Sequence, residues 1–172
     1  DLKLMLGTWR PVWILDFPMF GWDQKTKSWA ALHHPFTAPK ATIEEMQRNP
    51  GRCSSRAYDL VLNGYEVGGG SIRISDLQMQ REVFRVLGIS DEQAEQKFGF
   101  FLNALRYGCP PHGGIAFGLD RLAMLLVGKT SIREVMAFPK TGDGRDLMMD
   151  APSEVSKDQL KELGLEIKKG KK

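Results

Sequence analysis

Cysteine is scarce in this chain of 172 residues, where Cys53 and Cys109 are the only two. They form no Cys-x-x-Cys pair and no Cys/His cluster with the spacing of zinc ligands, which argues against a structural zinc site. Two separate thiols are typical of a protein kept in a reducing compartment. We therefore expect free cysteines and a cytoplasmic location.

Long apolar runs and a large excess of one charge are also missing. No stretch reaches the roughly 18 apolar residues expected of a membrane span, so we expect no membrane partner. The formal net charge is only +3, which argues against a protein that coats nucleic acid but permits contact with polyanions. The chain begins at Asp1 without a methionine or a signal peptide, which suggests a fragment or a processed product.

The composition, with 42% hydrophobic and 26% charged residues, is typical of a globular domain. The expected order is strands, helices, a strand and a helix, with a hairpin at the centre, which predicts an α+β fold with a mainly antiparallel sheet flanked by helices and not a doubly wound parallel one. The expected strands lie at residues 11–20 (buried, ending near Pro18), 29–35 and 136–138, with a hairpin around residues 58–73. A further strand is expected to begin at residue 113 and to lead through a tight junction into a helix. The expected helices lie at residues 42–47, 76–87, 90–108, 120–128, 131–135 and 156–163.

The hairpin is the most informative segment. Asn63-Gly64 is a strong signal for a two-residue I′ turn, because this turn needs positive φ at both central positions. The resulting register pairs Leu62 with Tyr65, Val61 with Glu66 and Leu60 with Val67. Asp59 and Glu66 then share one face of the hairpin as diagonal neighbours.

Two carboxylates so close together repel each other unless a cation or a proton lies between them. Such oxygen ligands suit Mg²⁺ that is also bound to substrate phosphates. The glycines at 68–70 allow a ligand to approach the backbone, and Arg73 offers a fork for a carboxylate or phosphate. The alternative at this point is a pair of solvated charges beside a plain glycine bulge.

A second candidate anion site lies where Gly118-Leu-Asp-Arg121 leads into a helix for which Asp120 is the expected cap. The free amides and the dipole of a helix N-terminus favour an anion, and Arg121 adds a permanent positive charge. The alternative is a surface ion pair between Arg121 and Asp120 or a nearby acid.

Taken together, these segments resemble the catalytic domain of class II aminoacyl-tRNA synthetases. The resemblance is carried by YDLVLNGYEVGGGSIR (58–73), PPHGGIAFGLDRLAMLL (110–126) and SIREVMAFPK (131–140). Residues 114–126 look like the third signature motif of that class. Two further stretches, WRPVWILDFPMF (9–20) and LHHPFTAPK (32–40), are similar to the bacterial-type (or organellar) aspartyl enzymes.

The resemblance implies a role for each candidate residue. Asp59 and Glu66 would hold Mg²⁺, and Arg73 would pair with the side-chain carboxylate of L-aspartate. His33 would donate a hydrogen bond to the same aspartate beside His34, although a loop histidine before Pro35 needs no such role. ATP would be bound by Glu66, Gly118, Leu119, Asp120 and Arg121.

The implied activity is that of an aspartate–tRNA ligase, which uses ATP and Mg²⁺ to form aspartyl-adenylate and transfers the aspartyl group to the acceptor end of tRNA. Residues 1–155 would be the C-terminal part of the catalytic domain, and residues 156–172 a final helix and basic tail. Compared with members of that family, this sequence lacks the anticodon-binding barrel and the first two class motifs. The first of these motifs builds the homodimer interface in the family. We therefore expect little or no activity from the isolated chain. A non-catalytic paralogue that binds nucleotide or acts as an interaction module, and a related amide-forming ligase, stay open as alternatives.

Overall fold

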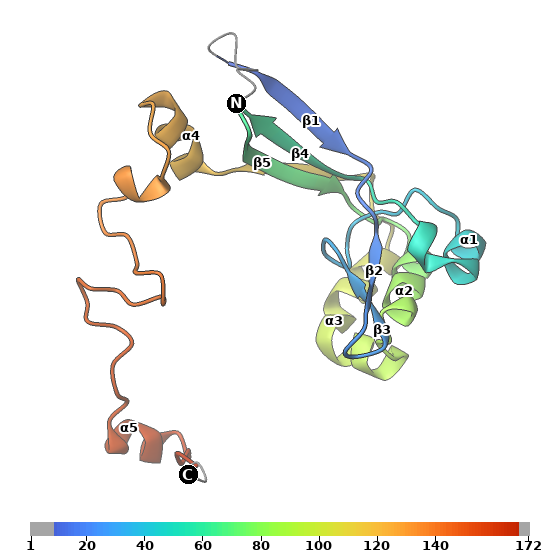
Figure 1. The fold of residues 1–172 in the computed structure, drawn as a ribbon. Coiled ribbons are helices and arrows are strands. Elements are labelled where there is room, and N and C mark those ends of the chain that lie inside the picture. Colours follow the sequence, from blue (N-terminus) through green and yellow to red (C-terminus); the bar gives the residue numbers. More distant parts are fainter. Residues whose placement is uncertain (1–8, 169–172) are drawn as a thin grey trace. The chain divides into compact units, whose positions relative to one another are not determined.

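The computed structural model describes residues 9–168, which form two compact units (Figure 1). The first unit extends to Leu122, and the second begins at Ala123. The boundary predicted at residue 155 separates the expected catalytic part from the last helix and the tail. It is a different kind of division from that between compact units, and it stays a prediction.

The first unit contains a four-stranded antiparallel sheet with the strand order β1-β4-β5-β6. Its strands are β1 (Pro11–Leu15), β4 (Ala57–Leu62), β5 (Tyr65–Ile72) and β6 (Gly113–Phe117). A smaller antiparallel hairpin joins β2 (Phe20–Asp23) to β3 (Ser28–Ala31). The predicted α+β fold with an antiparallel sheet and flanking helices is confirmed.

The helices of the first unit begin at side-chain caps, among them the capping box that Ser90 and Gln93 predict. Thr42 and Ser90 form capping boxes at the starts of α1 (Ile43–Arg48) and α3 (Asp91–Arg106), and Asp76 caps α2 (Leu77–Val86). A short 3₁₀ helix, η1 (Pro50–Arg52), follows α1. These helices and the β2–β3 hairpin gather at one end of the sheet (Figure 1).

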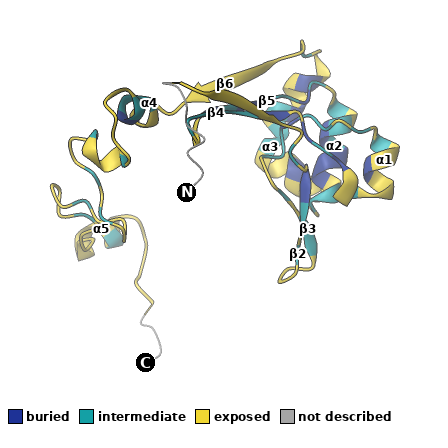
Figure 2. Cartoon of the chain, turned by 45° about the horizontal axis from the view of Figure 1, so that its top comes forward, coloured by how far each residue is buried: buried dark blue, intermediate teal, exposed yellow. Residues whose placement is uncertain are grey.

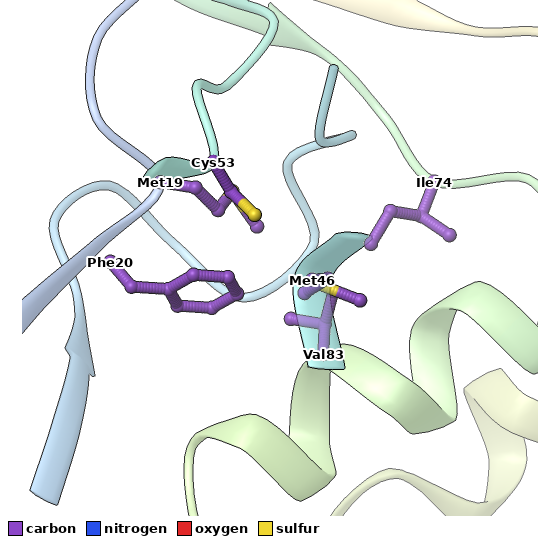
Figure 3. Packing of buried hydrophobic residues seen from close by; sticks show 6 residues of the cluster. All are labelled: Met19, Phe20, Met46, Cys53, Ile74 and Val83. Atoms are coloured by element: carbon purple, nitrogen blue, oxygen red, sulfur yellow. The ribbon is translucent and has the colours of Figure 1, made fainter. Parts of the chain in front are cut away.

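The hydrophobic core lies among these helices, and buried residues concentrate there whereas β6 is exposed (Figure 2). One cluster consists of Met19, Phe20, Met46, Cys53, Ile74 and Val83 (Figure 3). A second cluster contains Phe84, Ala94 and Leu102, with Phe36, Phe98 and Phe101 packed against it. These clusters anchor the segments that lead into both ends of the β4–β5 hairpin.

The first strand corrects one prediction. Its apolar sequence predicts burial, but all five residues of β1 are exposed. The strand is an edge of the sheet, and it ends at Leu15 because Asp16 adopts a left-handed conformation with φ 61°. Strand pairing resumes only as an isolated antiparallel bridge between Pro18 and Ser54.

The region after β6 contains α4 (Leu119–Leu126), the 3₁₀ helix η2 (Ile132–Glu134) and α5 (Lys157–Glu162). Asp120 lies in the first turn of α4 and not at its cap, so that prediction is wrong. No strand forms at residues 136–138, and the helix expected at 131–135 is a three-residue 3₁₀ turn. The expected last helix forms as α5, and Ser156 caps it. No helix in residues 9–168 has the length and apolarity needed to cross a lipid bilayer.

Candidate active site

The β4–β5 hairpin carries a β-bulge that the sequence pattern did not reveal. Asn63 (φ 52°) and Gly64 (φ 86°) form the predicted turn, and the predicted pairs Leu62–Tyr65 and Val61–Glu66 are confirmed. The predicted pair Leu60–Val67 is wrong, because Leu60 lies opposite Gly68 and leaves Val67 as an additional residue in β5. The next pair, Asp59 with Gly69, follows the shifted register.

This bulge decides which side chains of β5 share a face. Side chains alternate along a strand, so Glu66 and Arg73 would face opposite ways in a regular strand. One additional residue reverses the alternation, and Glu66 then lies on the same face as Gly69, Ser71 and Arg73. Asp59 projects from β4 onto this face as well, because it lies opposite Gly69.

The two predicted metal-binding acids meet above Gly69. A Cβ atom placed on Gly69 would lie 2.6 Å from Asp59 Oδ1 and 3.5 Å from Glu66 Oε1, so the glycine leaves room for both carboxylates. Burial and the negative charge of Glu66 raise the pKa of Asp59, and His33 opposes this shift. The acids are therefore close enough to repel each other, as the sequence predicts.

Arg121 lies beside the same acids. Its Nη1 donates to the backbone carbonyl oxygen of Glu66 at 2.6 Å and lies 3.4 Å from Glu66 Oε2. The Gly118 amide donates to the carbonyl oxygen of the bulged Val67 at 2.9 Å, which ties the start of α4 to β5. Arg121 thus pairs with Glu66, which is itself a candidate site residue, and not with Asp120. Leu119 and Asp120 are exposed in the first turn of α4.

Arg73 is held near the other end of this face. Its Nη1 donates to Ser71 Oγ at 2.9 Å and to His34 Nδ1 at 3.1 Å. Its backbone is fixed from two sides, since it bridges to Thr37 and its amide donates to the carbonyl oxygen of His112 at 2.9 Å. The guanidinium is therefore positioned by neutral groups and forms no ion pair within residues 9–168.

His34 orients Arg73 as a neutral ring. Its Nδ1 also accepts a hydrogen bond from the Phe36 amide at 3.2 Å, so this atom is an acceptor and the proton resides on Nε2. Burial, the charge of Arg73 and the charge of His33 lower the pKa of His34 to about 4. A protonated His34 would place a donor against Arg73, so the neutral form fits this arrangement.

His33 lies beside His34 and contacts Thr37. Its Nδ1 lies 2.9 Å from Thr37 Oγ1, and its ring centroid lies 4.5 Å from that of His34. His33 also lowers the pKa of Asp59, against the effects of burial and Glu66. The prediction of His33 and His34 as site residues omitted their partners Thr37 and Ser71, which are fully buried. Their places within HHPFT and GGGSIR were the available signal.

A cavity of about 470 Å³ opens beside Arg73. Its wall is mostly aromatic and contains His34, Phe36, Arg73, Phe98, Phe101 and His112. The sequence predicted Phe98 and Phe101 as core residues, and they are half-buried with one side turned to this cavity. A small charged ligand could therefore reach Arg73 from a largely apolar space.

The donors present fit Mg²⁺ that is shared with a phosphorylated substrate. Within the described part of the chain, no three or more His, Cys, Asp and Glu side chains gather as a complete ligand set. Asp59 and Glu66 supply a pair, and Mg²⁺ is usually held by one or two carboxylates together with phosphates and water. The raised pKa of Asp59 indicates a place where positive charge would be stabilising.

The sequence matches the family described as tRNA synthetases class II (D, K and N) over residues 1–142. The chain belongs to this family of aminoacyl-tRNA synthetases. Solved structures share its fold, among them the aspartyl-tRNA synthetase from Entamoeba histolytica, with 25% identity and a TM-score of 0.57 over 77% of this chain and 23% of that chain. The antiparallel sheet with its flanking helices is thus part of a class II catalytic domain.

Asparaginyl enzymes are similar to the same degree. That of Entamoeba histolytica in complex with asparaginyl-adenylate has 23% identity and a TM-score of 0.57, over 79% of this chain and 26% of that chain. That of Pyrococcus horikoshii has 23% identity and a TM-score of 0.56, over 77% and 27%. The present chain therefore spans about a quarter of the length of these structures. Their likeness does not distinguish aspartate from asparagine.

Proposed function

We propose that this synthetase chain provides part of the active site of a bacterial-type aspartate–tRNA ligase. One observation carries the proposal: the bulge at Val67 gives one face of β4–β5 a carboxylate pair, Asp59 and Glu66, and the positioned guanidinium of Arg73. Arg121 joins the acidic pair from the start of α4. Such a face suits a substrate with a carboxylate and a metal-bound phosphate chain.

Arg73 is the proposed partner of the side-chain carboxylate of L-aspartate. A guanidinium binds a carboxylate through two parallel hydrogen bonds, and Nη1 is already oriented by Ser71 and His34. Asparagine would leave the positive charge of Arg73 without a counter-charge, which lowers the affinity of the site for asparagine. His33 is the proposed donor of a further hydrogen bond to aspartate.

Asp59 and Glu66 are the proposed ligands of Mg²⁺ bound to ATP. The ion would neutralise phosphate charge when bound. Arg121 is oriented by the Glu66 carbonyl oxygen and would meet the γ-phosphate. Leu119 and Asp120 offer backbone amides at the start of α4, where an anion is stabilised. Gly118, whose own amide donates to Val67, is the proposed backbone contact that leads into this turn.

In the proposed reaction an oxygen of the aspartate α-carboxylate attacks the α-phosphorus of ATP, and the bond to pyrophosphate breaks. A ribose hydroxyl at the tRNA acceptor end then attacks the aspartyl carbonyl carbon, and AMP leaves. The side chains of this face need only bind, orient and neutralise charge, so none has to become a covalent nucleophile. Further segments of a homodimeric cytoplasmic enzyme would complete the site, and the chain alone is expected to have little or no activity.

The test is amino-acid-dependent exchange of pyrophosphate into ATP. It is measured for the 172-residue chain and for a longer polypeptide that adds the remaining catalytic segments, with L-aspartate and L-asparagine in parallel. We expect exchange only in the longer polypeptide and at least a hundredfold preference for aspartate. Preference for asparagine would overturn the aspartate assignment, and nucleotide binding without exchange in either form would favour a non-catalytic paralogue.

A further inference from the structure

A second pocket, with polar walls and a volume of about 390 Å³, is lined by residues of α1, η1 and the segments next to them. It shares no residue with the cavity beside Arg73. Three of its wall residues are cations from three consecutive segments: Lys40, Arg48 at the end of α1, and Arg52 in η1. Its one acidic wall residue, Glu45, uses Oε2 to accept a hydrogen bond from the Thr42 amide at 2.8 Å. We call these three cations the basic pocket.

The positive charge of the basic pocket is largely uncompensated. Arg48 and Arg52 form no ion pair within residues 9–168. Lys40 pairs with Asp16, but both side chains are about half exposed, so solvent screens that pair. Two guanidinium groups at one pocket therefore remain available for an anion.

The backbone that carries these cations is firmly anchored. Met46 in α1 is fully buried and Cys53 after η1 is 5% exposed, and both belong to the core cluster of Figure 3. The Lys40 amide donates to the Ser54 carbonyl oxygen at 2.8 Å, and the Met19 amide donates to the Cys53 carbonyl oxygen at 2.8 Å. The position of the pocket is thus fixed by the fold, and only the long side chains need to adapt.

Aromatic rings beside the basic pocket favour a nucleic acid over a free phosphate ion. A Cβ atom on Gly51 in η1 would lie 3.0 Å from the Trp29 ring, so this ring packs on η1. Trp22 contacts Trp29 edge-on with centroids 5.3 Å apart and remains 47% exposed. Cations that follow a backbone next to an exposed ring are the usual means of binding nucleic-acid phosphates and bases.

We propose that the basic pocket binds backbone phosphates of RNA. This inference rests on the proposed function, in which RNA is the acceptor of the aminoacyl group, and it assigns part of that contact to α1 and η1. The net charge of +3 is too small to attract RNA over the whole surface, so a localised contact is needed. Each phosphate contact releases counterions, which makes the binding depend on salt.

The test measures binding of fluorescently labelled tRNA to the 172-residue chain by anisotropy, between about 50 and 200 mM salt. The variant R48Q/R52Q is compared with K97Q/R106Q, which removes the same charge from exposed positions of α3. We expect R48Q/R52Q to bind roughly tenfold more weakly at low salt and to reduce the slope of log affinity against log salt by about two. The control pair is expected to change the slope by less than about one.

Two results would overturn the inference: an unchanged slope in R48Q/R52Q, or an equal loss in both double variants. R48K/R52K retains the charge and is expected to keep most of the binding, which separates lost contacts from misfolding. Inorganic phosphate is titrated in parallel, and saturation by phosphate without any loss of tRNA binding in R48Q/R52Q would assign the pocket to a free anion. The stabilisation of the folded chain by ATP, Mg²⁺ and aspartate is measured separately. A failure of the proposed function can therefore be distinguished from a failure of RNA binding at the basic pocket.

Discussion

Arg73 Nη1 lies 3.1 Å from His34 Nδ1, so the guanidinium proposed to bind the substrate is oriented by a histidine acceptor. This contact requires a neutral ring, because protonated Nδ1 would be a donor facing a donor. The Phe36 amide donates to the same atom, which excludes the other neutral tautomer. The charge state of His34 therefore determines whether Arg73 keeps one of the two side-chain acceptors that orient it, the other being Ser71 Oγ.

We first predict a pH dependence of stability from His34. Its pKa falls from 6.5 to about 4 on folding, so the folded state binds fewer protons than the unfolded state between these values. The stabilisation is present above pH 6.5 and is lost as the pH falls towards 4. Because the ring is partly exposed, we expect about 1–2 kcal/mol and not the full shift. Denaturant unfolding at several pH values, compared with His34→Asn, measures it.

NMR titration of the His34 ring provides the direct check of that prediction. A ring pKa near 4 agrees with the structure, and an ordinary value near 6.5 contradicts it.

The second prediction concerns the acidic pair. Glu66→Gln removes the negative charge that adds to burial in raising the pKa of Asp59, so this pKa is expected to fall. The same substitution removes a proposed Mg²⁺ ligand and is expected to weaken Mg²⁺·ATP binding at least tenfold. Carboxyl NMR titration and calorimetry measure the two effects.

Glu95→Gln is the matched control, since Glu95 is an exposed acid on α3. An Asp59 pKa that stays unchanged in Glu66→Gln, or changes equally in both variants, would show that the two acids are not coupled. In the native pair, the raised pKa of Asp59 makes protons compete with the metal, so Mg²⁺ affinity is expected to fall as the pH is lowered.

Signals that act within a few residues were sufficient to predict much of the fold. Ser90 and Gln93 form the predicted capping box, and helices begin after Thr42 and Asp76 as expected, because a helix start depends on a side chain and the amides of the next turn. The Asn63-Gly64 turn was predictable for the same reason. The exposure of β1 was not, since an apolar strand sequence does not show whether a neighbour covers it.

The site was predictable in its residues but not in its geometry. Asp59, Glu66, Arg73 and Arg121 stand out by their charges and by their surrounding motifs. The bulge at Val67 that brings Glu66 and Arg73 to one face depends on pairing across the strands, which local sequence does not show. The buried partners Thr37 and Ser71 were missed because they meet only after distant segments fold together.

The third prediction separates two glycines of paired strands. A Cβ atom on Gly70 would lie 1.9 Å from the Gly114 carbonyl oxygen, so Gly70→Ala must displace β6 from β5. A Cβ atom on Gly114 would have no heavy atom within 4 Å. We expect Gly70→Ala to lower the free energy of unfolding by about 3 kcal/mol or more and Gly114→Ala to change it by less than about 1 kcal/mol. Equal losses in chemical denaturation would contradict the close β5–β6 approach.

The last prediction concerns the exposed edge strand β1. Val12 and Leu15 are 50% and 57% exposed, and an apolar strand edge pairs readily with another chain. We expect the isolated chain to associate as its concentration rises, and Leu15→Lys to reduce this association because a charged edge residue opposes strand pairing. Leu165→Lys is the control, since Leu165 is 56% exposed but lies outside the sheet. Sedimentation velocity measures both, and association that responds equally to the two substitutions would show that general surface apolarity, and not the strand edge, drives it.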